Sequence, residues 1–327
     1  MTQAPGRGST ALPDGVTLRP ATAEEVPECG EIWRESLNDY MGRLNQPAIA
    51  GELGPIGRLH GHLRVTDPDR FWVAVREPAG GAPGQPLGFG AATRRDDVWF
   101  LSMLFVRPAE QRRGIGRALL GCLLPDDGAA ISTATDSAQP ISNALYAVHG
   151  MVPRMPLLSL VGRPRGVEAL GRLPSGVSAV PFHDIASAGP GGQGHLMLVD
   201  TIDGLDREVA GFAHPQDHRF LRSQERRGFL YRGPDGAPLA YGYASEVGRL
   251  GPVAVRDEAL MAPVLGHLLE TVQPRDASIV WVPGDAGAAV QGLLRAGLRL
   301  DGFPVLLCWD RPFADFARYL PISPGLL

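Results

Sequence analysis

The sequence of 327 residues contains no lysine, only three cysteines and no long apolar run. Cys29, Cys122 and Cys308 are far apart and odd in number, which excludes a disulfide framework and indicates a reducing compartment, expected to be the cytoplasm. No apolar run approaches the length that spans a bilayer, so no membrane partner is expected. The N-terminus lacks the apolar segment of a signal peptide, and we predict a disordered lead-in over residues 1–15.

All 31 basic residues are therefore arginine, and with 42 glycines and 30 prolines this indicates a GC-rich genome rather than a function. A formal net charge of −4 argues against a general nucleic-acid binder. Hydrophobic residues make up 44% of the chain and charged residues 20%, which is typical of a globular protein. The length favours about two domains. We expect Cys122 and Cys308 in the core, because both lie at apolar positions.

The segment Leu104–Leu120 is the most informative part of the chain. An apolar strand over Val98–Val106 leads through a charged turn into a helix that opens at Gly114-Ile115-Gly116. A helix start exposes several backbone N–H groups at the positive end of the helix dipole, and such a start binds anions. Arginines in the turn add positive charge. The pattern predicts a site for a ligand that carries phosphate.

Spacing distinguishes the common phosphate loops. A Walker loop ends in Gly-Lys-Ser/Thr, which this loop lacks. A dinucleotide fingerprint requires a small residue three positions after Gly116, where Leu119 stands. The remaining pattern, Gln111-x-x-Gly114-x-Gly116 after a strand, resembles the pyrophosphate loop of the GCN5-related N-acetyltransferase (GNAT) family, which binds acetyl-coenzyme A. For these six residues alone, a glycine-rich turn before an ordinary helix is the alternative.

A second motif follows in the same order as in that family. The segment Gln139–Tyr146 resembles the family's later helix, which carries a tyrosine and ends at a glycine, here Gly150. Pro140 suits an early helical position. The family usually has asparagine where this chain has Gln139, a conservative departure. Two motifs in order extend the resemblance over residues 16–164.

The resemblance implies acetyl-CoA as co-substrate and a direct transfer of acetyl to an amine, with Tyr146 protonating the leaving thiolate. The loop amides would hold the pyrophosphate, and the backbone of the preceding strand would pair with the pantetheine arm. The implied cofactor-binding residues are Leu104, Phe105, Val106, Gln111, Arg112, Arg113, Gly114, Ile115, Gly116, Arg117, Gln139 and Asn143.

Hydrophobic periodicity predicts the same order of elements in both halves of the chain. In the first half we predict strands at Val16–Arg19, Phe71–Arg76, Leu87–Thr93, Val98–Val106, Ala130–Thr135 and Met155–Val161, and helices at Glu24–Leu44, Gly114–Leu124 and Pro140–His149. In the second half we predict strands at Val177–Val180, Phe229–Arg232, Leu239–Ser245, Val253–Arg256, Ser278–Val282 and Val305–Trp309, and helices at Gly194–Gly211, Leu260–Val272 and Ala286–Ala296.

The repeat indicates two tandem domains of one fold, and the resemblance implies that this is an α/β (α+β) fold of two GNAT-like domains, each a mixed, mostly antiparallel sheet flanked by helices. The catalytic domain is expected over residues 16–164, a linker over 165–176, a second domain over 177–312 and a tail over 313–327. A shift of 149 residues replaces Gln111, Gly114 and Gly116 by Leu260, Pro263 and Leu265, and a shift of 147 replaces Tyr146 by Leu293. The second copy therefore lacks the phosphate cradle. It would pack on the first domain, wall the acceptor site or mediate a homodimer.

The general base and the acceptor amine, from a small molecule or a peptide, stay open. Glu35, Asp39 and Asp136 are candidate bases, although surface carboxylates are usually only solvated. The histidine pairs His60/His62 and His214/His218 have metal-like spacing, but a zinc site requires a third protein ligand, and none is evident. We predict no metal. The alternative function is an acyl-CoA-binding regulatory or interaction module with little turnover.

Overall fold

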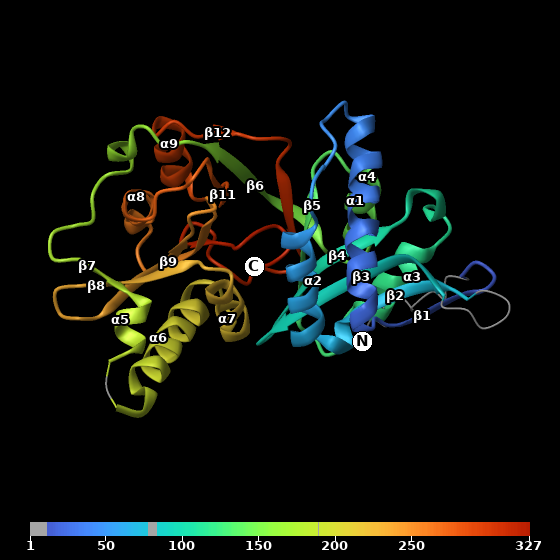
Figure 1. Ribbon diagram of the computed structural model, residues 1–327, viewed down its shortest axis with the longest axis horizontal. Coiled ribbons are helices and arrows are strands. Elements are labelled where there is room, and N and C mark those ends of the chain that lie inside the picture. Colours follow the sequence, from blue (N-terminus) through green and yellow to red (C-terminus); the bar gives the residue numbers. More distant parts are fainter. Residues whose placement is uncertain (1–11, 78–83, 189) are drawn as a thin grey trace. The chain divides into compact units, whose positions relative to one another are not determined.

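The chain divides into two compact units in the computed structural model, which describes residues 12–77, 84–188 and 190–327 (Figure 1). The first unit comprises the chain up to Arg94 together with Trp99–Ala129, and the second comprises Arg95–Val98 and Ala130–Leu327. None of the helices in these ranges is long and apolar enough to cross a membrane.

The first unit is a sheet covered by helices. Its strands β1 to β4 follow one another in chain order, and β1 and β3 both pair antiparallel with β2. Apolar residues of β1, β2, β3 and α3 form a cluster that packs this helix on the sheet. The elements are β1 (Val16–Pro20), α1 (Val26–Arg43), α2 (Gly54–Thr66), β2 (Phe71–Arg76), β3 (Gln85–Arg95), β4 (Val98–Val106) and α3 (Ile115–Leu123).

The second unit contains two groups of paired strands. One has the order β5-β13-β6-β11, with β12 pairing off this path with β6, and the other has the order β14-β10-β9-β8-β7. The strands are β5 (Ala130–Asp136), β6 (Val152–Gly162), β7 (Ser178–Pro181), β8 (Arg227–Arg232), β9 (Pro238–Ala244), β10 (Leu250–Val255), β11 (Ser278–Pro283), β12 (Arg299–Leu300), β13 (Val305–Trp309) and β14 (Tyr319–Leu320). The helices are α4 (Pro140–Val148), α5 (Phe182–Ala186), α6 (Gln193–Val209), α7 (Pro215–Ser223), α8 (Met261–Thr271) and α9 (Gly287–Arg295).

Strand β13 lies between β5 and β6, although it follows them by most of the second half of the chain. Val305 is paired with Asp136 on one side and with Leu157 on the other, both antiparallel. The far half of β6 pairs with β11. Strands expected in different tandem domains are thus interleaved in one sheet.

The predicted fold class is confirmed, and the repeat has a clear structural signature. The C-terminal ends of α4 and α9 carry Gly150 and Gly297 at φ +93° and +96°. Each end is closed by the same bond, from the N–H of Met151 to the carbonyl of Tyr146 at 3.1 Å, and from Leu298 to Leu293 at 3.0 Å. Positive φ at such a cap is the conformation glycine adopts without steric cost. The two copies, 147 residues apart, therefore have the same helix C-cap.

Other expectations have a mixed outcome. The domain boundaries at residues 165–176 differ from the division into compact units and stay a prediction, while the expected tail holds β14, which pairs with β10. Most of the predicted lead-in, residues 1–11, lies outside the described residues.

Cys308 is buried as expected, but the prediction that Cys122 lies in the core is wrong. Cys122 is exposed, because it lies on the outer side of α3 between the buried Leu119, Leu120 and Leu123.

Candidate functional site

The loop between β4 and α3 adopts the conformation that leaves a helix start open. Gly114 is the N-cap residue of α3 at φ +85°, and no side chain caps the helix. Arg112 also has positive φ, +62°. The first N–H groups of a helix have no acceptor within it, and here no side chain stands in for one at the cap. The backbone thus presents a concave set of donors to an anion.

The loop is tied to the end of β4 by two side chains. The hydroxyl of Ser36 and the side-chain amide of Gln111, through Nε2, each donate to the Val106 carbonyl at 2.9 Å. A carbonyl oxygen has two lone pairs, so these bonds use both. Gln111 therefore holds the loop on the strand, and the Val106 carbonyl has no acceptor capacity left for a ligand.

Positive charge gathers beside the helix start. Arg112, Arg113 and Arg117 are exposed. Arg113 shares the carboxylate of Glu110 with Arg76, at 2.7 Å from each arginine. The hydrogen bond from Arg76 is the main cause that lowers the pKa of Glu110. One negative charge thus faces two guanidinium groups, which leaves a net positive loop.

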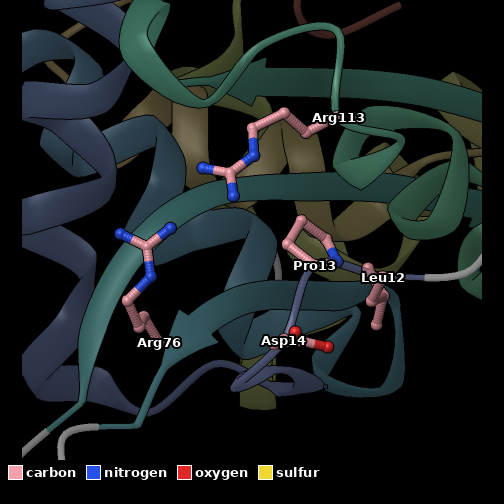
Figure 2. Close-up of a pocket in the computed structure, with 5 residues that line it drawn as sticks. All are labelled: Leu12, Pro13, Asp14, Arg76 and Arg113. Carbon is pink, nitrogen blue, oxygen red and sulfur yellow. The ribbon is translucent and has the colours of Figure 1, made fainter.

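A cavity of about 680 Å³ opens next to this loop (Figure 2). Its lining residues are Leu12, Pro13, Asp14, Arg76 and Arg113. Figure 2 shows the guanidinium groups of Arg76 and Arg113 pointing toward one another within it. The cavity adds room for a phosphate-bearing group beside the loop.

The second group of predicted site residues lies on α4. Asn143 Nδ2 donates to the carbonyls of Asp136 at 3.0 Å and Gln139 at 2.8 Å, while its buried Oδ1 has no hydrogen-bond donor. Tyr146 is 6% exposed and hydrogen-bonded to Ser142. Burial raises the pKa of this phenol, and Cys308 adds to the effect. The phenol is therefore protonated at neutral pH. The predicted residues form two groups, the β4–α3 segment in the first unit and α4 in the second.

Comparison with known proteins agrees with this geometry. Residues 67–150, which include the loop and all of α4, match the family described as "Acetyltransferase (GNAT) domain". This stretch of the chain resembles a GNAT domain. The match ends at Gly150, where α4 has just been capped.

Solved structures extend the likeness over both copies of the repeat. A protein of Pyrococcus horikoshii, named only provisionally as an acetyltransferase, is 15% identical, with a TM-score of 0.69 and 98% of each chain covered. A GCN5-related N-acetyltransferase from Sphaerobacter thermophilus is 17% identical, with a TM-score of 0.56, 94% of this chain covered and 100% of the other. No curated relative matches by sequence. At these identities the likeness shows the fold, a GNAT fold over nearly the whole chain.

The carboxylates considered as general bases of the GNAT domain all have partners. Glu35 forms an ion pair with Arg107, and Asp39 one with Arg43 at 2.7 Å. Asp136 accepts from the N–H of Ala138 at 2.9 Å. The geometry therefore favours none of the three over the others.

The matching segment of the second copy has the opposite construction. The carboxylate of Asp257 caps it by accepting from the N–H of Ala259 at 3.0 Å, so the chain supplies its own anion. Leu260 and Leu265 are buried at the positions that correspond to Gln111 and Gly116 of the β4–α3 loop, and Leu293 is buried at the position that corresponds to Tyr146 of α4. This segment therefore contributes to the hydrophobic core and does not form an anion site.

A third ligand candidate for His214 and His218, absent from the sequence prediction, comes from α6. Within the described residues, Asp206, His214 and His218 form a buried group whose ligand atoms all lie within 4.8 Å of one another. Asp206 interrupts the apolar face of α6, between Leu205 and Val209. An acid within a buried apolar stripe is the signal that sequence reasoning passed over.

Proposed function

We propose that this protein is an acetyl-CoA-dependent N-acetyltransferase that moves acetyl to a primary amine of a small molecule or of a peptide N-terminus or side chain. The observation that carries the proposal is the open start of α3, with Gly114 in a left-handed conformation, no side-chain cap and three exposed arginines around it. That combination suits a pyrophosphate. The three free cysteines agree with a cytoplasmic location.

In this proposal the loop amides of Arg112–Gly116 hold the pyrophosphate, and Arg113 and Arg117 neutralise its charge. The backbone of Leu104 to Val106 flanks the pantetheine arm. The Val106 carbonyl is not a partner of this arm, because it already accepts hydrogen bonds from Ser36 and Gln111. Asn143 offers its unpartnered Oδ1. Acetyl-CoA supplies an activated thioester. The chain binds it, orients it and keeps a proton at the Tyr146 hydroxyl for the leaving sulfur.

Calorimetry with acetyl-CoA tests the loop. Gly114→Pro is expected to weaken binding at least about tenfold, because proline cannot adopt positive φ and removes a donor. Gly121→Ala is the matched control on the same helix, since the added methyl group meets nothing within 4 Å. It should bind like the unmodified protein. Equal affinity of the proline variant, with the fold intact by circular dichroism, would show that the loop is not the cofactor site.

The second candidate function is an acyl-CoA-binding module with little turnover. The burial of Tyr146 and its bond to Ser142 favour it, because an acid must reach the departing sulfur. Thiol release with a panel of primary amines separates the two candidates. An N-acetyltransferase releases thiol above the hydrolysis background with at least one amine, whereas the binding module does so with none.

Tyr146→Phe resolves the role of the phenol. Loss of a general acid should lower kcat by about 10²–10⁴-fold while the calorimetric affinity for acetyl-CoA stays within about twofold. Phenylalanine keeps the buried ring, so the protein is expected to fold normally. An unchanged kcat would mean that the ring only packs and that sulfur takes its proton from elsewhere.

A further inference from the structure

A compact polar cluster lies inside the second unit and joins side chains of α6, α7 and β9, elements that Figure 1 labels. His214 stands at the start of α7, His218 one turn later, and Asp206 near the end of α6. Both Nε2 atoms face the same carboxylate oxygen. Asp206 Oδ2 lies 2.8 Å from His218 Nε2 and 3.3 Å from His214 Nε2. The three side chains are at most 3% exposed.

Hydrogen bonds hold the outward atoms of Asp206 and His218, and the outward nitrogen of His214 faces a carboxylate. Tyr241 donates its hydroxyl to Asp206 Oδ1, and Tyr243 lies 3.0 Å from His218 Nδ1. His214 Nδ1 faces Asp217 Oδ2 at 3.6 Å.

Asp217 is itself fixed by Arg95, with two bonds of 2.7 and 2.9 Å. Metal-binding histidines commonly have one nitrogen on the ion and the other bonded to a carboxylate or a hydroxyl, and His218 is oriented in this way. Outer hydrogen bonds thus orient Asp206 and His218, whereas the contact between His214 Nδ1 and Asp217 Oδ2 is electrostatic at 3.6 Å.

The spacing suits a small tetrahedral ion. Ligand atoms about 2.0–2.1 Å from an ion are separated by about 3.3–3.4 Å in a tetrahedron. The distance from Asp206 Oδ2 to His214 Nε2 has this value, and the distance to His218 Nε2 has to open by roughly 0.5 Å. Tyr319 places its hydroxyl 3.5 Å from His214 Nε2 and offers a fourth oxygen.

We propose that Asp206, His214 and His218 bind one divalent transition-metal ion, with zinc as the favoured ion. Two imidazoles and a carboxylate are ligands that zinc accepts, and a tetrahedral site suits it. The ligands are buried and come from two helices that adjoin the core of the second unit. The ion therefore has a structural role, joining α6 to α7, and this role is independent of the acetyl transfer proposed above.

A metal-free arrangement is the competitor. Burial lowers the pKa of His214, but the carboxylates of Asp206 and Asp217 outweigh burial and raise that pKa to about 9. Without an ion, a protonated His214 would balance these carboxylates together with Arg95. The two arrangements differ in metal content and in the effect of a chelator, both of which can be measured without enzymatic activity.

The test begins with the full chain, purified without a histidine tag and without chelator. We expect about one zinc per chain by elemental analysis, and a Tm that falls by several degrees when zinc is removed with a chelator and recovers when zinc is restored. Asp206→Asn and His218→Gln should lose the metal. His267→Gln, in which the lost imidazole is bonded to Tyr231 at 2.9 Å, should retain it.

A further variant separates metal binding from mere packing. Asp217→Asn keeps the shape of the side chain but removes the negative charge that faces His214 Nδ1, and should lower the zinc affinity roughly 10–100-fold in competition with a chelator. If the unmodified chain holds less than about a tenth of an equivalent after dialysis against zinc, with a Tm that neither zinc nor chelator changes, the proposal is wrong and the cluster is a hydrogen-bonded network.

Discussion

His60 lies fully buried in the first unit against two aromatic rings, with its ring centre 5.0 Å from that of Phe89 and 6.1 Å from that of Phe71. Neither ring nitrogen has a hydrogen-bond partner in the described part of the chain. Burial therefore disfavours the charged imidazolium and lowers the pKa of His60 from 6.5 to about 4.

This histidine makes the stability of the protein depend on pH. Since the unfolded chain takes up the proton first, stability is complete above about pH 6.5 and falls as the pH decreases toward 4. We expect His60 to lower the free energy of unfolding by about 2 kcal/mol when the pH falls from 7 to 5. Urea unfolding of the protein and of His60→Leu at both pH values isolates this contribution. Equal losses in the two proteins would mean that the imidazole is not desolvated.

At the scale of elements, the helix ends at Gly150 and Gly297 allow a test of whether the two copies of the repeat have the same energetic requirement at this cap. In both places an added methyl group meets its nearest atom at 3.5 Å or more, so space is not the constraint. The constraint is the positive φ, which costs a residue other than glycine roughly 1–2 kcal/mol.

Gly150→Ala and Gly297→Ala should therefore each lower the free energy of unfolding by about 1 kcal/mol. Gly204→Ala in α6 provides the opposite case, because it lies within a helix with open space around it. That change should stabilise the protein by roughly 0.5–1 kcal/mol. Denaturant midpoints measured side by side give the comparison. A neutral effect at either cap would show that the two helix ends are not equivalent.

For the whole molecule, the position of β13 decides which pieces can fold alone. A fragment of residues 16–164 keeps β5 and β6 but loses the strand that pairs with both. Unpaired apolar strand edges promote aggregation, and the fragment also loses their hydrogen bonds.

We therefore expect the 16–164 fragment to be insoluble or to unfold without cooperativity, although it spans the whole predicted catalytic domain. Extending it through a flexible linker with residues 303–311 should restore a cooperative transition, because β13 can return to its place. Thermal melts followed by circular dichroism compare the two fragments. A cooperative melt of the short fragment would show that β13 is dispensable for this sheet.

Much of the local structure was predictable from the sequence. The strands β2, β4 and β13 have the predicted bounds, and the helices α3, α4 and α9 lie within about two residues of theirs. The turn at residues 233–236, rich in glycine and proline, joins β8 and β9. Hydrophobic period, glycine at special φ and proline at helix starts act over a few residues, so they can be read without knowing the fold. The sequence did not predict the bounds of helix α2, because its apolar pattern is weak.

The sequence by itself determined the two copies, the glycine loop before α3 and the loss of that loop in the second copy, since each depends on neighbouring residues. The tertiary structure alone decided that β13 enters between β5 and β6, that Cys122 faces outward, and that Asp206 joins His214 and His218. The reason is physical. Many apolar strands are able to pair with one another, and the partner that is chosen depends on how the whole chain buries its apolar surface.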